Sequence, residues 1–154
     1  MPDRTACYDE LQEPQKRGQA TEAIIQSAFV LRDIPVLVPT YGSDAYDLVI
    51  EVGGRFHRLE CKTAYRKRKG TVEFETISAQ LDPDSADRCG YDGRAAYFAV
   101  YDPINDNRYL IPVSESTHDT MALRVRESAT DHRVGIDRAR EYLLDTQLEE
   151  LRRP

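Results

Sequence analysis

The 154-residue sequence has no apolar run long enough to cross a membrane, and residues 1–6 lack the pattern of a signal peptide. We therefore expect a cytoplasmic protein that does not bind membranes. The three cysteines are irregularly spaced, which excludes a disulfide framework or a zinc pattern and favours free thiols. The three histidines lack the spacing of metal ligands. With neither repeats nor low-complexity segments, this length predicts one domain.

Lysine is scarce. The chain has 4 Lys against 17 Arg, 15 Asp and 12 Glu, with a net charge of −6. This is the wrong sign for a protein that binds DNA through bulk positive charge. An acidic, lysine-poor and arginine-rich surface is typical of proteins from a high-salt cytoplasm, so we expect a haloarchaeal or halophilic viral source. A GC-rich mesophile would share the arginine bias. In molar salt, binding would depend on shape and hydrogen bonds because charges are screened.

Hydrophobic periodicity and turn residues predict the order of the elements. Residues 1–15 are polar and predict a flexible arm, followed by a single domain over 16–154. The expected elements of that domain are a helix at 16–32, strands at 36–38, within 47–62 and at 71–77, 95–101 and 108–113, a short helix at 114–120, an edge strand at 122–126, a basic loop at 66–70 and a terminal helix at 138–152. This order predicts an α/β or mixed α+β domain, in which helices flank a mixed β-sheet.

Residues 47–62 are the most informative stretch because Gly53-Gly54 predicts a two-residue hairpin turn. If these glycines form the turn, paired positions sum to 107, and Asp47 lies opposite Glu60. Two facing carboxylates repel each other unless a cation lies between them. Lys62 projects from the same face as Glu60, whereas the alternate positions are apolar. The hairpin therefore predicts an Asp/Glu/Lys site with the layout of a magnesium-dependent phosphodiesterase.

An ordered set of motifs resembles the PD-(D/E)xK nuclease superfamily. The motifs are Gly18-x-x-Thr21-Glu22, Val36-Leu37-Val38-Pro39, Ala45-Tyr46-Asp47-Leu48-Val49, Glu60-Cys61-Lys62-Thr63 and Tyr97-Phe98-Ala99-Val100-Tyr101. The order resembles the subgroup of intron-encoded homing endonucleases and, over the first 65 residues, archaeal Holliday-junction resolvases. The proline of the family name is absent, since Tyr46 stands there, and the homing subgroup often carries Gln where this chain has Glu60. The resemblance implies a restriction-endonuclease-like core.

The resemblance also implies the roles of the site residues. Glu22, Asp47, Glu60 and Lys62 are the expected catalytic set. Asp47, Glu60 and the backbone carbonyl of Cys61 would bind Mg²⁺, or else Mn²⁺, and Glu22 would hold a metal-bound water. Magnesium accepts such oxygen ligands and retains several waters. Lys62 would hold or activate the attacking water.

DNA is the expected partner, in duplex or branched form. The residues expected to contact it are Lys16, Arg17, Gly18, Ser43, Thr63, Arg66, Lys67, Arg68 and Lys69. We expect a magnesium-dependent DNA endonuclease of homing, mobile-element or viral type. The alternatives are a Holliday-junction resolvase and a DNA-binding or assembly module that has lost the chemistry. A chain this small contacts few base pairs, so we expect a homodimer or homotetramer, assembled through the strands after residue 95 or the helix at 138–152.

Overall fold

The computed structural model describes residues 8, 10–42, 46–77, 94–117, 119–126 and 137–154. Its elements are α2 (Pro14–Val30), β1 (Val36–Leu37), β2 (Leu48–Val52), β3 (Arg55–Thr63), β4 (Tyr65–Arg68), β5 (Thr71–Glu75), β6 (Tyr97–Asp102), β7 (Asn107–Pro112), η1 (Val113–Glu115), β8 (Thr120–Arg124), β9 (Asp137–Arg138), η2 (Ala139–Tyr142) and α3 (Leu144–Arg152). In the described part of the chain, no helix is both long and apolar enough to span a membrane.

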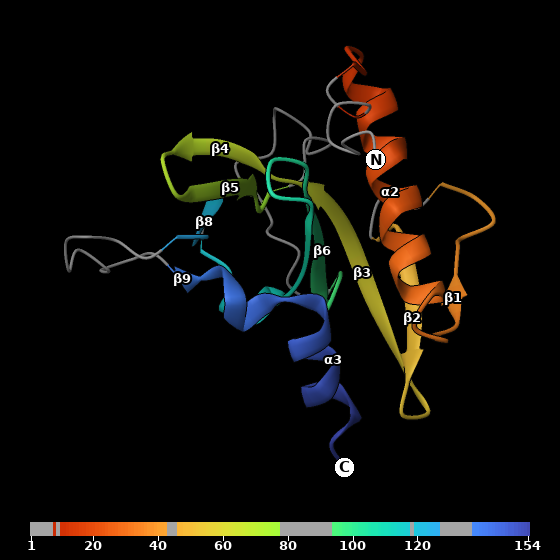
Figure 1. Cartoon of the computed structure of the whole chain (residues 1–154). Helices are drawn as coiled ribbons and strands as arrows, with labels where there is room; N and C mark the ends of the chain where they lie inside the picture. Colours follow the sequence, from red (N-terminus) through yellow and green to blue (C-terminus); the bar gives the residue numbers. More distant parts are fainter. Residues whose placement is uncertain (1–7, 9, 43–45, 78–93, 118, 127–136) are drawn as a thin grey trace, which may run out of the picture.

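The strands form two sheets (Figure 1). The first has five strands in the order β1-β2-β3-β6-β7, with β3 and β6 parallel and the other neighbours antiparallel. The second has four strands in the order β4-β5-β8-β9. The first sheet confirms the expected mixed sheet flanked by helices. The second sheet was not predicted, because short strands whose partners lie 50 residues away carry no local signal of their pairing.

Two hydrophobic clusters pack on opposite faces of the five-stranded sheet. On one face, Ile25 and Phe29 of α2 and Leu148 of α3 pack against β2, β3 and alternate residues of β6. On the other face, Phe98 and Val100 of β6 pack against β5 and β8 of the second sheet. Burial on both faces explains the continuous apolar run of β6, since a strand covered on both sides needs apolar residues throughout. The domain therefore has a helical layer, a central sheet and a second, smaller sheet.

The hairpin of β2 and β3 has the predicted register. Leu48 pairs with Leu59 and Val52 with Arg55, so paired positions sum to 107. Gly53 and Gly54 have φ values of 61° and 78°. Positive φ at both central residues is the geometry of a two-residue turn whose twist matches the strands. The predicted core positions Leu48, Ile50, Val52 and Leu59 are all buried.

Several predicted boundaries were wrong. The terminal helix expected at 138–152 begins at Leu144, after β9 and the 3₁₀ turn η2. The basic stretch 66–70 is not only a loop, because its first three residues belong to β4. The strand predicted at the edge over 122–126 is β8, which lies between β5 and β9. The helix predicted at 114–120 is only the single 3₁₀ turn η1, Val113–Glu115.

The expectation of a flexible arm over 1–15 does not hold at Tyr8 and Pro14. Pro14 begins α2, where a proline is well suited because its missing N–H needs no partner in the first turn. Tyr8 is 6% exposed and belongs to the hydrophobic cluster under α2.

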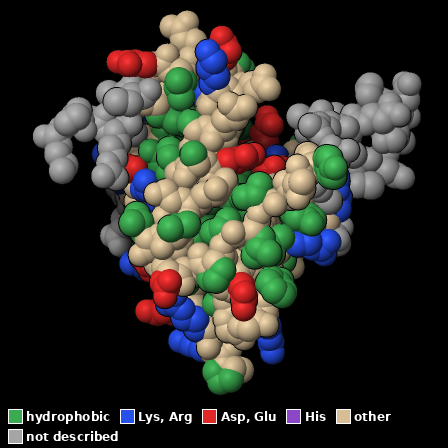
Figure 2. Space-filling view, turned by 90° about the vertical axis from the view of Figure 1, so that its right-hand side faces the viewer, with side chains coloured by type: hydrophobic (Ala, Val, Ile, Leu, Met, Phe, Trp, Pro, Cys, Tyr) green, Lys and Arg blue, Asp and Glu red, His purple; other side chains and the backbone are tan. Residues whose placement is uncertain are grey.

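In the described strands after residue 95, most of the large hydrophobic side chains are buried inside the chain. A group of exposed hydrophobic side chains lies on the face that carries the end of α2 and β1, shown in Figure 2. The exposed residues of these two elements and the position after β1 are Val30, Leu31, Leu37 and Val38, and Tyr41, Phe56, Tyr65 and Ile104 are exposed elsewhere.

Candidate active site

The candidate site lies where β3 extends past the end of β2. β2 begins at Leu48, which pairs with Leu59, whereas β3 continues to Thr63. Among the described strands, the last four residues of β3 therefore pair only with β6, and this segment is called the free edge of β3. Asp47 occupies the start of this open edge, and its N–H donates to the Leu59 carbonyl at 2.9 Å. The site is thus positioned by two strands of unequal length.

Asp47 is fixed by a second hydrogen bond. The backbone N–H of Cys61 donates to Oδ2 of Asp47 at 2.9 Å. Asp47 directly precedes β2, and its side chain accepts a hydrogen bond from β3 where β2 no longer supplies a backbone partner. Such charge-assisted bonds are about twice as strong as neutral ones. The bond sets the Asp47 carboxylate beside the Glu60–Lys62 segment, as the predicted register requires.

Glu22 reaches this edge from α2, on the helical face of the sheet. Partial burial raises the pKa of Glu22, and the charge of Asp47 and a hydrogen bond with its carboxyl raise it further. The two carboxylates therefore lie close together, as expected for a pair that shares a cation or a proton. The sequence placed them 25 positions apart, and packing of α2 on β3 joins them.

Glu60 and Lys62 lie on the opposite face from α2. They pair with Phe98 and Val100, which belong to the cluster between the two sheets. The Lys62 Nζ donates to the Ile77 carbonyl at 3.0 Å. Burial lowers the pKa of Lys62, although the charges of Glu60, Glu75 and Asp47 act in the opposite direction. Carboxylates from both faces thus converge on the free edge of β3.

Glu75 was not predicted as a site residue. It is the last residue of β5. Its negative charge acts to raise the pKa of the Lys62 amine, against the larger lowering effect of burial. Sequence reasoning could not find it because the side-by-side placement of β3 and β5 depends on the second sheet.

Within the described ranges, no three His, Cys, Asp or Glu side chains are grouped closely enough to form a metal cage. Magnesium does not need one, because it commonly binds through one or two carboxylates and keeps several waters. Cys61 lies in a negatively charged environment. Burial raises the pKa of its thiol, and the charges of Asp47, Glu22 and Glu60 raise it further. Three carboxylates therefore act electrostatically on the same segment of β3.

Three hydroxyl groups connect the two halves of the site. The hydroxyls of Thr21 and Thr63 lie 2.6 Å apart, and Tyr8 Oη lies 3.2 Å from the first and 3.3 Å from the second. Thr21 precedes Glu22, and Thr63 follows Lys62. Thr63 was expected to contact DNA, and the structure shows that its hydroxyl is engaged inside the protein. The tyrosine fixes the helix to the strand beside the site.

The predicted DNA-contact residues separate into groups. Arg17, Gly18, Thr63 and Arg66 line one cavity of about 420 Å³ between the start of α2 and the end of β3. Lys69 lines an adjoining cavity and Arg68 is exposed, whereas Lys16 pairs with Glu13 at the start of α2. Ser43 lies outside the described residues.

Lys67 has a structural partner. Its Nζ lies 3.0 Å from Oε2 of Glu73, a β5 carboxylate that is 5% exposed. Burial alone would raise the pKa of Glu73, but hydrogen bonds from Lys67, Thr120 and Tyr65 lower it overall. Lys67 therefore neutralises a buried charge, and the basic run is not one uniform DNA-binding loop.

His57 is half-buried and has a packing partner, as the register predicted. It pairs with Ile50, and its ring packs edge-on against Tyr97 at a centroid distance of 5.8 Å. Burial lowers the pKa of His57. It lies on the strand that carries the site but at the turn end of it.

The model of the PD-(D/E)XK endonuclease family matches residues 12–145. The chain belongs to this family. It is therefore a nuclease, and the predicted superfamily is confirmed. Among solved structures, the bacterial homing endonuclease I-Ssp6803I is similar, with a TM-score of 0.67 at 15% identity over 92% of this chain and 95% of that one. This likeness confirms the restriction-endonuclease-like fold. No curated protein matches this PD-(D/E)XK nuclease significantly in sequence.

Proposed function

We propose that this PD-(D/E)XK nuclease is a magnesium-dependent DNA endonuclease of homing, mobile-element or viral type. The observation that carries the proposal is the convergence of Glu22, Asp47, Glu60 and Lys62 at the free edge of β3, with Glu22 and Asp47 close enough to raise the pKa of Glu22. The likeness to I-Ssp6803I over nearly the whole chain supports the homing type over a junction resolvase.

Each residue has a distinct proposed role. Asp47, held by the Cys61 N–H, and Glu60 would bind Mg²⁺, together with the Cys61 carbonyl, and Glu22 would hold a water at the same ion. When bound, the metal polarises the scissile phosphate and lowers the pKa of its water. Manganese would satisfy the same oxygen donors.

Lys62 is the proposed proton-handling group. Burial favours its neutral form, and the neighbouring carboxylates favour its charged form. It can therefore hold the attacking water and offset charge in the transition state while its hydrogen bond to Ile77 keeps the ammonium in place. Preorganised charge of this kind supplies much of the catalysis in phosphoryl transfer.

The test is a cleavage assay on supercoiled plasmid, linear duplex and a synthetic four-way junction, with Mg²⁺, Mn²⁺ or EDTA, over a range of KCl. We expect metal-dependent cutting of duplex that Asp47→Asn, Glu60→Gln and Lys62→Met each reduce by at least about 10²-fold. Glu51→Gln, on β2 but away from the free edge, is the matched control and should cut normally. Preference for the junction would instead establish a resolvase. Folded wild type that binds DNA but cuts no substrate would establish an inactive binding module.

We further propose that the enzyme works as a homodimer or homotetramer. The support is the exposed apolar group at the end of α2 and on β1, where Leu31 is 82% exposed. Light scattering after size exclusion should give at least twice the chain mass for wild type and the single mass for Leu31→Glu. A wild-type monomer on DNA would contradict the proposal.

A further inference from the structure

A second basic cavity lies beyond the candidate site. Its volume is about 370 Å³, and three cationic residues line it: Arg66, Lys69 and Arg126. It shares Arg66 and Ile104 with the cavity at the start of α2, so the two adjoin. Together they form a track from Arg17, beside the end of β3, to Arg126. In a chain with a net charge of −6, this concentration of cations stands out.

The cavity is assembled from three segments that are distant in the sequence. Lys69 and Gly70 come from the β4–β5 turn, Ile104 and Asn105 from the β6–β7 turn, and Arg126 follows β8. Residues of both turns line the same cavity. The sequence showed a basic run at 66–69 but gave no indication that Arg126 joins it.

The position of Arg126 is fixed by Gly70. The N–H groups of Val125 and Arg126 both donate to the Gly70 carbonyl, at 2.8 and 3.2 Å. Gly70 has a φ of 82°, and a Cβ there would lie 3.3 Å from the Cβ of Arg126. The positive φ favours glycine in this turn, and a Cβ there would also be in tight contact with Arg126. The arginine is held at its backbone while its side chain stays exposed at the cavity.

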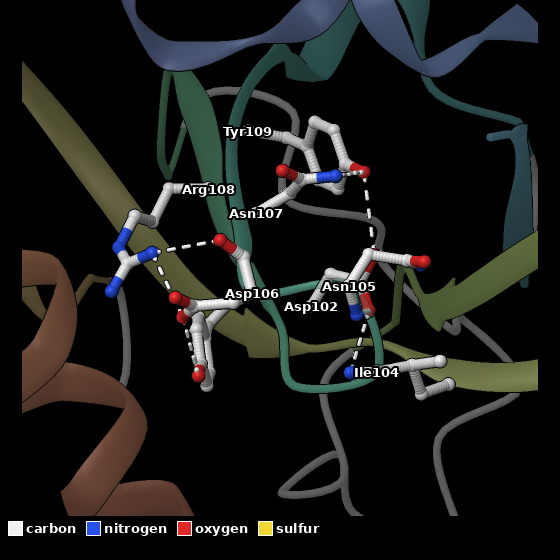
Figure 3. Close-up of polar contacts among 8 residues, drawn as sticks. Asp102, Ile104, Asn105, Asp106, Asn107, Arg108 and Tyr109 are labelled. Carbon is white, nitrogen blue, oxygen red and sulfur yellow. Dashed lines mark hydrogen bonds and ion pairs between the residues drawn. The ribbon is translucent and has the colours of Figure 1, made fainter. Parts of the chain in front are cut away.

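The opposite wall is rigid. Asp102 is fully buried and accepts hydrogen bonds from the N–H groups of Ile104 and Asn105, at 2.9 and 3.2 Å, and from Nδ2 of Asn105 at 2.8 Å. Tyr109 Oη donates to the same carboxylate at 3.3 Å (Figure 3). The β6–β7 turn therefore enters the cavity in one fixed conformation.

We propose that this cavity binds the sugar–phosphate backbone of the DNA strand that flanks the cleaved bond, with Lys69 and Arg126 as the phosphate contacts. The inference rests on the proposed endonuclease function. None of the described residues that line the cavity is acidic, so no carboxylate in this described lining opposes a phosphate. The side chains of Val125 and Ile104 supply apolar surface on which deoxyribose can pack. The shared Arg66 makes the path continuous with the cavity that contains Arg17 and Thr63.

The experiment measures binding without cleavage. The probe is a fluorescein-labelled mixed-sequence duplex in EDTA, titrated by anisotropy at several KCl concentrations. We expect Lys69→Ala and Arg126→Ala each to weaken binding several-fold at low salt. Each should also reduce the slope of log affinity against log salt by about 1, as for one lost phosphate contact. Arg126→Lys should restore most of the affinity because a phosphate accepts a point charge.

Arg55→Ala is the matched control. Arg55 is an exposed arginine at the turn end of β3, and its removal should change neither affinity nor slope. Equal losses for Arg55→Ala and Arg126→Ala would overturn the inference, because the effect would then be net charge alone. Unchanged binding in the Lys69 and Arg126 variants would also overturn it. Wild type that binds but never cuts would instead refute the endonuclease function and leave the binding site standing.

Discussion

The hydroxyls of Thr21 and Thr63 share a 2.6 Å hydrogen bond between α2 and β3. Thr21 is 1% exposed, and each threonine is the chain neighbour of a candidate catalytic residue, Glu22 or Lys62. Glu22 is on α2 and Lys62 is on β3, and these two elements belong to different layers. The bond between the threonines and the hydroxyl of Tyr8 therefore fix the position of α2 relative to β3. Positioning of this kind controls rate rather than affinity, since reacting groups that are displaced slightly lose much of their effect.

We predict that Thr63→Val lowers the cleavage rate at saturating DNA about fivefold, with little change in DNA affinity. The reason is the loss of a hydrogen bond of about 1 kcal/mol at a point that orients the site. Thr63→Ser keeps the hydroxyl and should restore the rate, and Tyr8→Phe should reproduce part of the loss. Single-turnover kinetics give the rate, and anisotropy gives the affinity. A loss of affinity with an unchanged rate would show that Thr63 contacts DNA instead.

Glu22 predicts a pH-dependent stability in metal-free protein. Its folded pKa lies above its ordinary value, so the folded state disfavours the ionised form. This lowers the free energy of unfolding. The loss is absent below the unfolded pKa of about 4.3 and grows as the pH rises through the folded pKa of Glu22. Glu22→Gln should therefore stabilise the protein at pH 7 but not at pH 4. Solvent screening limits the gain to about 1 kcal/mol, or about 2–4 °C in Tm.

Thermal unfolding in EDTA, with Glu51→Gln as control, measures this effect. Adding Mg²⁺ should then raise the Tm of wild type more than that of Glu22→Gln, because a ligand that binds only the folded state stabilises it. An equal magnesium response in both proteins would remove Glu22 from the metal site.

The sequence predicted the register of the hairpin that carries three of the candidate site residues. Asp47, Glu60 and Lys62 follow from the Gly53-Gly54 turn alone, because a two-residue turn fixes every pairing of its hairpin. Glu22 needed the family pattern, since no local rule relates a helix residue to a strand 25 positions later.

The parts that the sequence missed depend on contacts that are distant along the chain. Glu75 and Arg126 acquire their surroundings only when β5 pairs with β8 in the second sheet. Lys67 belonged to a basic run that was expected to contact DNA, and only the pairing of β4 with β5 shows that Glu73 lies beside it. Tyr8 was missed because a single aromatic residue in a polar segment has no periodicity to mark it.

The pair Lys67–Glu73 predicts a difference between two adjacent basic residues. Lys67→Ala leaves the buried carboxylate of Glu73 without its cation and should destabilise the fold by about 1–3 kcal/mol, since the hydrogen bond from Tyr65 remains. Arg68→Ala, at an exposed neighbouring position, should change stability by less than about 0.5 kcal/mol. Adding Glu73→Gln to Lys67→Ala should recover part of the loss. Urea unfolding at pH 7 measures all three.

The sign of the pH dependence provides a second check on this pair. The folded pKa of Glu73 is lowered, so its stabilisation is present above the unfolded pKa and is lost as the pH falls through the folded value. The difference between wild type and Lys67→Ala should therefore shrink as the pH falls below about 4, where the free carboxyl protonates. A difference that stays constant down to pH 3 would assign the effect to packing of the lysine stem.

Asp102 predicts a graded loss of stability at the β6–β7 turn. Asp102→Ala removes the acceptor for two backbone N–H groups and two side-chain donors in a fully buried position, which should cost about 2–4 kcal/mol. Asp102→Asn keeps an oxygen for the backbone N–H groups at Oδ1 but loses the acceptor at Oδ2, so its loss should be smaller. Urea unfolding should show that the wild type is the most stable, Asp102→Asn is intermediate and Asp102→Ala is the least stable. If Asn and Ala were equally destabilised, the charge rather than the hydrogen bonds would hold the turn.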